Sequence, residues 1–131
     1  MDLSSISRKE AGALGERVAA HYLSERGFEI VGRNITRKTG EVDIIARKDD
    51  TLHFVEVKSI VCEALPDPQG KQDEYDPSAN LHEAKIRKVA RTAEWYTAER
   101  DWEGDWQVDG CLVWLRRTDG MAHVSYLPQI V

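Results

Sequence analysis

The chain has 131 residues, of which 41% are hydrophobic and 31% charged, a composition typical of one globular domain spanning residues 1–131. Its sequence contains no apolar run as long as a membrane span, and residues 1–10 lack the apolar core of a signal peptide. We therefore expect a cytoplasmic protein with no membrane partner, in which Cys62 and Cys111 are reduced. The net charge of −5 mildly disfavours nucleic acid as a partner, but the charges are unevenly distributed.

The first predicted element is a helix that begins after Ser7, because Ser7 and Glu10 have the spacing of a capping box. Apolar residues then recur at three- and four-residue steps as far as Gly27, which predicts the end of the helix. The following segment, residues 28–35, is rich in β-forming side chains and is predicted to be a strand.

A β-hairpin is predicted next, from residues 41–47 and 52–58, with a polar break between them. A loop centred on Asp49 and Asp50 determines its register. Asp43 then lies opposite Glu56, and Glu41 lies opposite Lys58. Directly opposed side chains of an antiparallel pair point to the same face, about 5 Å apart at Cβ.

Residues 62–79 combine prolines with acidic side chains and are predicted to form a loop. A second helix is predicted to start near Asn80, with Glu83 at the spacing of a capping box. Its flanks carry four basic residues, which are candidates for phosphate contacts, with Lys85 the foremost, or form a plain solvated face: Lys85, Arg87, Lys88 and Arg91.

The C-terminal part is predicted to contain a loop at 101–105 and two strands at 108–116 and 121–127, joined by a tight turn. The predicted order is therefore helix, three strands, helix and two strands. This order favours a mixed α/β fold with a central sheet and helices on its faces.

Asp43 and Glu56 form the candidate chemical site. Two opposed carboxylates repel each other, and a divalent cation between them would compensate for this repulsion. Mg²⁺ and Mn²⁺ accept oxygen ligands, and Mg²⁺ binds through one or two carboxylates together with substrate phosphates. Lys58 is on the same predicted face, where it can hold the attacking water or stabilise charge on the phosphorane. The pattern predicts metal-assisted phosphodiester hydrolysis. The structural alternative is a salt-bridge cluster in which Glu41 and Lys58 pair while Asp43 and Glu56 point to water.

The runs Gly40-Glu41-Val42-Asp43 and Phe54-Val55-Glu56-Val57-Lys58 resemble the PD-(D/E)XK nuclease superfamily. They resemble more closely the YraN family of small bacterial proteins, which are similar to archaeal Holliday junction resolvases. The resemblance covers most of the chain, through positions that include Gly12, Gly15, Glu16, Gly27, Lys85, Trp95, Tyr96 and Asp109.

This resemblance implies a restriction endonuclease-like fold and a Mg²⁺- or Mn²⁺-dependent endonuclease. DNA is favoured over RNA as substrate, with branched or structured DNA a candidate, and a homodimer is implied. Residue by residue, it implies that Asp43, Glu56 and the backbone carbonyl of Val57 bind the metal. It also implies that Lys58 assists the water and that Glu16, on the first helix, completes the catalytic site.

The segment 65–77 departs from the family pattern, because it is long and acidic where relatives carry a short basic stretch. Together with the net charge, it motivates an alternative function: a nucleic-acid- or protein-binding module that keeps the nuclease fold and cleaves nothing.

Several other residues receive structural interpretations. Asp109 is interpreted as a turn or capping residue near the start of a strand. The four histidines have no metal-ligand spacing. The four tryptophans are expected to pack in the core or in loops rather than to stack on bases: Trp95, Trp102, Trp106 and Trp114.

Overall fold

The computed structural model describes residues 1–66 and 81–131, so most of the acidic segment 65–77 and the expected helix start at Asn80 lie outside the described residues. It confirms the predicted order of elements and the mixed α/β class. The elements are α1 (Arg8–Glu25), β1 (Glu29–Arg37), β2 (Gly40–Lys48), β3 (Thr51–Cys62), α2 (Glu83–Glu99), β4 (Asp105–Arg116) and β5 (Ala122–Leu127).

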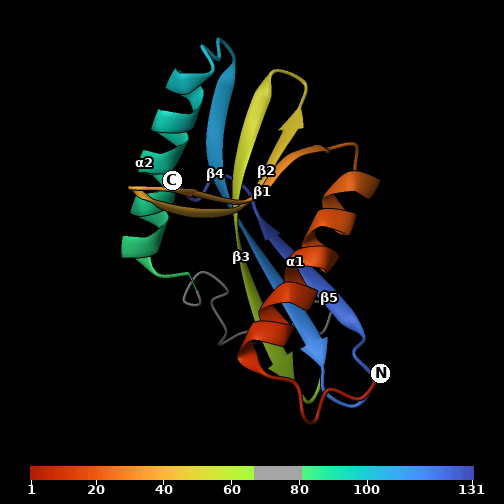
Figure 1. Ribbon diagram of the computed structural model, residues 1–131. Coiled ribbons are helices and arrows are strands. Elements are labelled where there is room, and N and C mark those ends of the chain that lie inside the picture. Colours follow the sequence, from red (N-terminus) through yellow and green to blue (C-terminus); the bar gives the residue numbers. More distant parts are fainter. Residues whose placement is uncertain (67–80) are drawn as a thin grey trace.

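The five strands form one sheet in the order β1-β2-β3-β4-β5. All neighbouring strands are antiparallel except β3 and β4, which run parallel along their whole length. A parallel pair requires a crossover connection, and the segment that contains α2 provides it. Figure 1 shows α1 and α2 on opposite faces of this sheet, with β3 and β4 running through both halves of the molecule. No helix of the described residues is long and apolar enough to cross a membrane.

Each helix covers its own apolar cluster. On the α1 side, Ala19 and Leu23 pack against Ile44, Val55 and other buried side chains of the sheet. On the α2 side, the buried residues are Val42, Ile45, Leu52, Phe54, Val89, Ala93, Tyr96 and Val108. Burial of these side chains on two faces holds both helices in place relative to the same central strands.

The ends of α1 follow the prediction. Ser7 Oγ accepts a hydrogen bond from the amide of Glu10 (3.1 Å), and Glu10 Oε1 accepts one from the amide of Ser7 (3.2 Å), which is the expected capping box. Gly27 has φ +85° and donates its amide hydrogen to the carbonyl of Ser24 (3.2 Å). This left-handed conformation suits glycine, which explains why the helix ends there.

Several predicted boundaries differ from the structure. α2 begins at Glu83 with His82 as N-cap, and the His82 side chain makes no capping hydrogen bond. The expected capping residue, Asn80, lies outside the described residues. β4 begins at Asp105 rather than at Val108. The tertiary pairing explains the earlier start, because Thr51 lies beside Asp105 in the parallel ladder.

The predicted register of the β2–β3 hairpin is confirmed from Lys48↔Thr51 to Ile44↔Val55. The described ladder between β2 and β3 ends at the Ile44↔Val55 pair. The predicted ladder pairs of Asp43 with Glu56 and of Glu41 with Lys58 are therefore wrong. β3 continues beside β4 up to Cys62, whereas β2 leaves it. We call the place where β2 and β3 separate the fork.

An irregularity in β2 accounts for the fork. Val42 and Ile45 both pack on the α2 side, whereas Ile44 packs on the α1 side. Regular alternation would place Val42 and Ile44 on the same face, so the pleat is interrupted at Asp43. The neighbouring strand is irregular at the same level, where Asn34 has φ +51°. Asp43 therefore points into the fork instead of continuing the ladder.

Candidate active site at the fork

A cleft of about 620 Å³ lies at the fork, between the N-terminal half of α1 and the part of β3 that β2 has left. Its walls carry both acidic and basic side chains. The lining includes Arg8, Gly12, Glu16, Asp43, Val57, Lys58, Ser59, Lys85 and Arg117.

Asp43 occupies the apex of the fork. Its Oδ2 accepts a hydrogen bond from the amide of Val57 (2.8 Å), and this bond takes the place of a ladder contact between the two strands. Burial raises the pKa of Asp43, although the Val57 amide acts in the opposite direction. The side chain is thus held in position while its ionised form is disfavoured.

Glu56 is 4% exposed and lies between Asp43 and α2. Its Oε1 pairs with Nζ of Lys85 at 2.6 Å, whereas its Oε2 is buried with no hydrogen-bond partner among the described residues. Burial, followed by the nearby charge of Asp43, raises the pKa of Glu56 to about 7. The two carboxyl groups therefore interact closely even though their backbones form no ladder pair.

Glu16 faces the same cleft from α1. Its Oε1 is buried and has no hydrogen-bond partner within residues 1–66 and 81–131. Burial and then the charge of Asp43 raise the pKa of Glu16, while Arg33 acts against them. The side chain thus points inward, as the resemblance implied, and a third carboxyl group joins the other two.

Gly15 sets the distance between α1 and β3. A Cβ atom at this position would lie 1.7 Å from Oγ and 2.9 Å from Cβ of Ser59. Only glycine allows this approach, which brings the adjacent Glu16 over the fork.

We expect Gly15→Ala to lower the free energy of unfolding by about 1–3 kcal/mol, because the helix must move away from Ser59. Gly12→Ala is the matched control: a Cβ at Gly12 meets nothing within 4 Å, and alanine should raise helix stability by about 0.5–1 kcal/mol. Urea unfolding of both variants measures the difference. Equal changes in the free energy of unfolding for Gly15→Ala and Gly12→Ala would contradict the close contact between Gly15 and Ser59.

The predicted site residues thus meet at one place. Lys58 is exposed at the rim of the cleft, beside Val57. Lys85, the foremost candidate for a phosphate contact, pairs with Glu56 in this structure.

The other three basic residues of α2 lie outside the cleft lining. Arg87 is exposed and pairs with Glu83 at 2.7 Å, and Lys88 and Arg91 are exposed further along the helix.

The side chains at the fork fit a divalent cation only as a site with two carboxylate ligands, Asp43 and Glu56. No group of three or more His, Cys, Asp or Glu side chains in residues 1–66 and 81–131 is arranged to hold a metal ion. Asp43 and Glu56, however, are adjacent carboxyl groups with raised pKa values, and Glu56 Oε2 has no hydrogen-bond partner in the part of the chain that the structure describes. Mg²⁺ commonly binds through one or two carboxylates, with water and phosphate as the other ligands.

The raised pKa of Glu56 predicts a pH dependence of stability in chelator. Between its ordinary value of 4.5 and about 7, this carboxyl group binds more protons in the folded chain than in the unfolded chain. The free energy of unfolding should therefore fall as pH rises through that window, by on the order of 2–3 kcal/mol. Urea titrations at pH 4.5, 6 and 7.5 measure it. Glu56→Gln should flatten the dependence, and a wild type that gains stability across the window would contradict it.

A second buried polar cluster surrounds Asp109, which is fully buried inside β4. The interpretation as a turn or capping residue is therefore wrong. The Asp109 carboxylate accepts hydrogen bonds from the Tyr126 hydroxyl, from Gln107 Nε2 (2.7 Å) and from the Gln129 amide (2.8 Å). His53 Nδ1 lies 2.6 Å from it. Sequence patterns did not indicate this cluster, because its members come from three strands and the C-terminal segment.

Comparison with known proteins shows to which family this chain is related. Residues 15–121 match the model of the family described as Uncharacterised protein family UPF0102. A UPF0102 protein of Campylobacter jejuni strain 81-176 is 40% identical over 98 residues, which cover 75% of this chain and 78% of that protein. One of Campylobacter fetus is 36% identical over 115 residues, covering 88% and 93%. One of Sulfurovum sp. strain NBC37-1 is 38% identical over 103 residues, covering 78% and 81%. The predicted YraN-type relationship is thereby confirmed, and the chain belongs to the UPF0102 family.

Proposed function

We propose that the protein is a nuclease that depends on Mg²⁺ or Mn²⁺ and hydrolyses phosphodiester bonds in DNA. One observation carries this proposal: Glu16, Asp43 and Glu56 converge at the fork, and two of their carboxyl oxygens are buried without hydrogen-bond partners among the described residues. Such raised-pKa carboxyl groups in a cleft are typical of sites that bind a cation or move a proton.

The carboxylates of Asp43 and Glu56, with the backbone carbonyl of Val57, would hold the cation. The chemistry that the bound cation supplies is a lower pKa for the attacking water and neutralisation of charge on the departing oxygen. Asp43 keeps its orientation through the Val57 amide. In the absence of substrate, the ammonium group of Lys85 balances the charge of Glu56.

Two further side chains have roles at the phosphate. Lys58 is exposed at the cleft rim and places a positive charge where the phosphorane forms. Glu16, whose pKa is raised, is suited to accept a proton from the attacking water at its buried Oε1. Arg8 and Arg117 also line the cleft and favour an anionic substrate.

A cleavage panel tests the proposal. Single-stranded, duplex, flapped and four-way DNA and an RNA strand are incubated with Mn²⁺ or with chelator, beside the Asp43→Ala/Glu56→Ala double variant. Cutting by the wild type in Mn²⁺ alone is expected. Cutting that survives in chelator or in the folded double variant would reject the assignment. The homodimer implied by the resemblance is tested by sedimentation of the same samples.

A second candidate function is a non-catalytic binding module with the same fold. The ion pair between Lys85 and Glu56 favours it, because Lys85 already supplies a positive charge to this carboxyl group. For this function, no cutting is expected on any substrate, with or without Mn²⁺. A salt titration of DNA binding in chelator then distinguishes ligands: contacts to phosphate give a steep loss of affinity with ionic strength, and a protein-binding module gives no such DNA affinity.

A further inference from the structure

Trp95 is 60% exposed on α2, which contradicts the expectation that the tryptophans pack in the core or in loops. Trp102 and Trp106 are half-buried, and Trp114 is 9% exposed. No ring and no cation of the described residues stacks on the Trp95 indole. The exposed indole offers a π-face on which a nucleic-acid base can stack.

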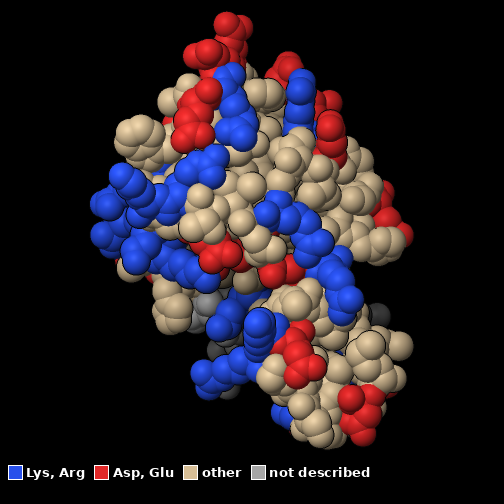
Figure 2. All heavy atoms as spheres, viewed as in Figure 1, with Lys and Arg blue, Asp and Glu red and all other residues tan. Residues whose placement is uncertain are grey.

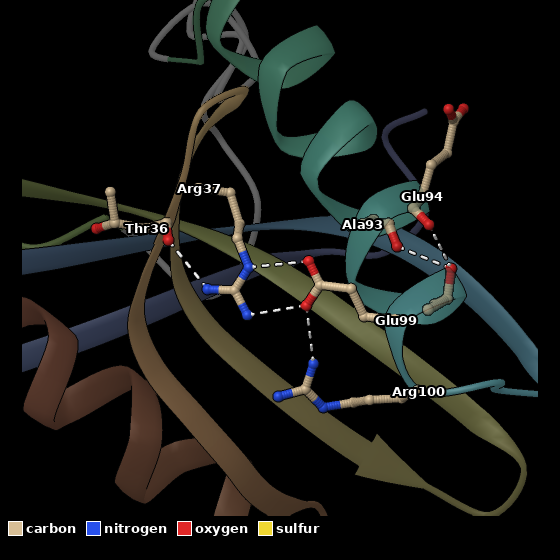
Figure 3. A network of polar contacts seen from close by, with 7 residues as sticks. Thr36, Arg37, Ala93, Glu94, Glu99 and Arg100 are labelled. Atoms are coloured by element: carbon tan, nitrogen blue, oxygen red, sulfur yellow. Dashed lines mark hydrogen bonds and ion pairs between the residues drawn. The ribbon is translucent and has the colours of Figure 1, made fainter.

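The Trp95 ring borders a depression of about 400 Å³ between α2 and the β1–β2 hairpin. Arg37, Lys38, Thr39 and Glu99 form the rest of its lining. Figure 3 shows one wall of it from close by: Arg37 from β1 points its guanidinium group at the Glu99 carboxylate, and Arg100 contacts the same carboxylate. The nitrogen–oxygen distances are 3.2 and 3.4 Å for Arg37 and 3.5 Å for Arg100. The Glu99 charge is therefore compensated within the wall.

A second contact holds the hairpin against α2. The hydroxyl groups of Thr39 and Thr92 lie 2.7 Å apart, and Thr92 also donates to the carbonyl of Lys88 (2.9 Å). A Cβ atom at Gly40 would lie 3.1 Å from Cβ of Lys88, so the two elements are in close contact there. Contacts between the β1–β2 hairpin and α2 thus hold the two walls of the depression together.

The surroundings of the depression are basic. Figure 2 shows Lys and Arg side chains gathered over the region where Figure 1 draws α2 and the β1–β2 hairpin. Lys38 extends from the hairpin, and Lys88 and Arg91 lie one to two turns before Trp95 on the same side of α2. None of these three forms an ion pair within the described residues. A flat aromatic ring bordered by unpaired cations suits a ligand with a π-face and phosphates, which is a nucleotide.

The helix also relates this surface to the fork. Lys85, whose ammonium group contacts Glu56, precedes Trp95 by ten residues on α2. At 1.5 Å per residue the two positions are about 15 Å apart along the helix axis. That distance corresponds to about four nucleotides at a rise of 3.4 Å per nucleotide. Along the helix axis, a few nucleotides therefore span the distance between the level of Lys85, which contacts Glu56, and the level of Trp95.

We propose that Trp95 is a stacking site for an unpaired base of the nucleic acid whose phosphate lies at the fork. This inference rests on the proposed function, since it takes a polynucleotide as the ligand. Lys38, Lys88 and Arg91 contact the adjoining phosphates. A base inside a duplex is already stacked on both faces, so the site selects substrates with unpaired bases near the point of cleavage, such as single strands and strand junctions.

The test measures binding in chelator, so that it does not depend on cleavage. Fluorescence anisotropy follows a labelled single-stranded oligonucleotide, the same strand with abasic sites, and the matching duplex. Trp95→Ala should weaken binding of the single strand by about 5- to 150-fold. Trp95→Phe should retain most of the affinity, because phenylalanine keeps a π-face. Met121→Ala is the control, since Met121 is 54% exposed in the turn before β5 and its loss should change nothing.

Wild-type protein should bind the abasic strand about as weakly as Trp95→Ala binds the normal strand, and duplex affinity should be the same in both proteins. Equal affinity of wild type and folded Trp95→Ala for the single strand would overturn the stacking site. So would an equal loss with Trp95→Phe. Absence of cleavage in Mn²⁺ beside Trp95-dependent binding would reject the nuclease and leave the stacking site supported. Cleavage beside Trp95-independent binding would reject the stacking site alone.

Discussion

Asp43→Asn is expected to lower metal-dependent DNA cleavage by on the order of 10²- to 10³-fold and to stabilise the metal-free protein. Asparagine retains an oxygen that can accept the Val57 amide hydrogen bond, so the fork should keep its geometry. It removes the negative charge beside Glu56, which is the second cause of the raised pKa of that residue. The free energy of unfolding at pH 8 in chelator should rise by about 1–2 kcal/mol, because fewer like charges are buried together.

Glu41→Gln is the matched control for this variant. Glu41 is exposed on the same strand and also acts on Asp43 through its charge, but its side chain is not among the cleft lining. It should change cleavage and stability much less than Asp43→Asn. Cleavage rates in Mn²⁺ and urea unfolding in chelator provide both measurements. An Asp43→Asn protein that cuts normally, or that is less stable than the wild type, would contradict the role given to the carboxylate.

Asp109→Ala is expected to lower the free energy of unfolding by about 3–5 kcal/mol, since removing one partner of a buried charged cluster leaves the others uncompensated. The donors left behind include His53, the Tyr126 hydroxyl and the Gln129 amide. These contacts join β3, β5 and the C-terminal segment to β4, so their loss should loosen that edge of the sheet. Asp105→Ala is the control at the exposed start of the same strand, with an expected change within about 0.5 kcal/mol.

The contribution of Asp109 to the free energy of unfolding should also depend on pH. Burial by itself raises the pKa of Asp109, but the hydrogen bonds from His53, the Gln129 amide, Tyr126 and Gln107 together hold it below its ordinary value of 3.8. At a pH near and just below 3.8, the Asp109 carboxyl group therefore binds fewer protons in the folded chain than in the unfolded chain. The stabilisation is present above pH 3.8 and is lost as pH falls through the folded-state pKa. The difference between wild type and Asp109→Ala in urea unfolding should shrink between pH 5 and pH 2. A constant difference would exclude an ionised Asp109 as its source.

Local sequence signals predicted the elements because their causes are local. The capping box of Ser7 and Glu10 and the glycine at 27 act within one helical turn, and both are present where expected. The hairpin register followed from a two-residue loop and is confirmed as far as Ile44 and Val55. The start of α2 was predicted near Asn80, whereas the helix begins at Glu83, where His82 supplies no side-chain cap that the sequence pattern could indicate.

Local patterns were enough to predict the order of helices and strands and the hairpin register near its loop, and together with the family resemblance they pointed to the residues that meet at the fork. How these residues meet depends on contacts between elements that are distant in the sequence. β3 leaves β2 for a parallel partner distant in the sequence, Lys85 reaches Glu56 from the other face, and Asp109 is enclosed by several elements. The physical reason is the range of the interactions. Capping, pleat and turn conformation depend on residues a few positions apart, whereas burial of a carboxyl group and the resulting pKa depend on elements that approach only after the chain has folded.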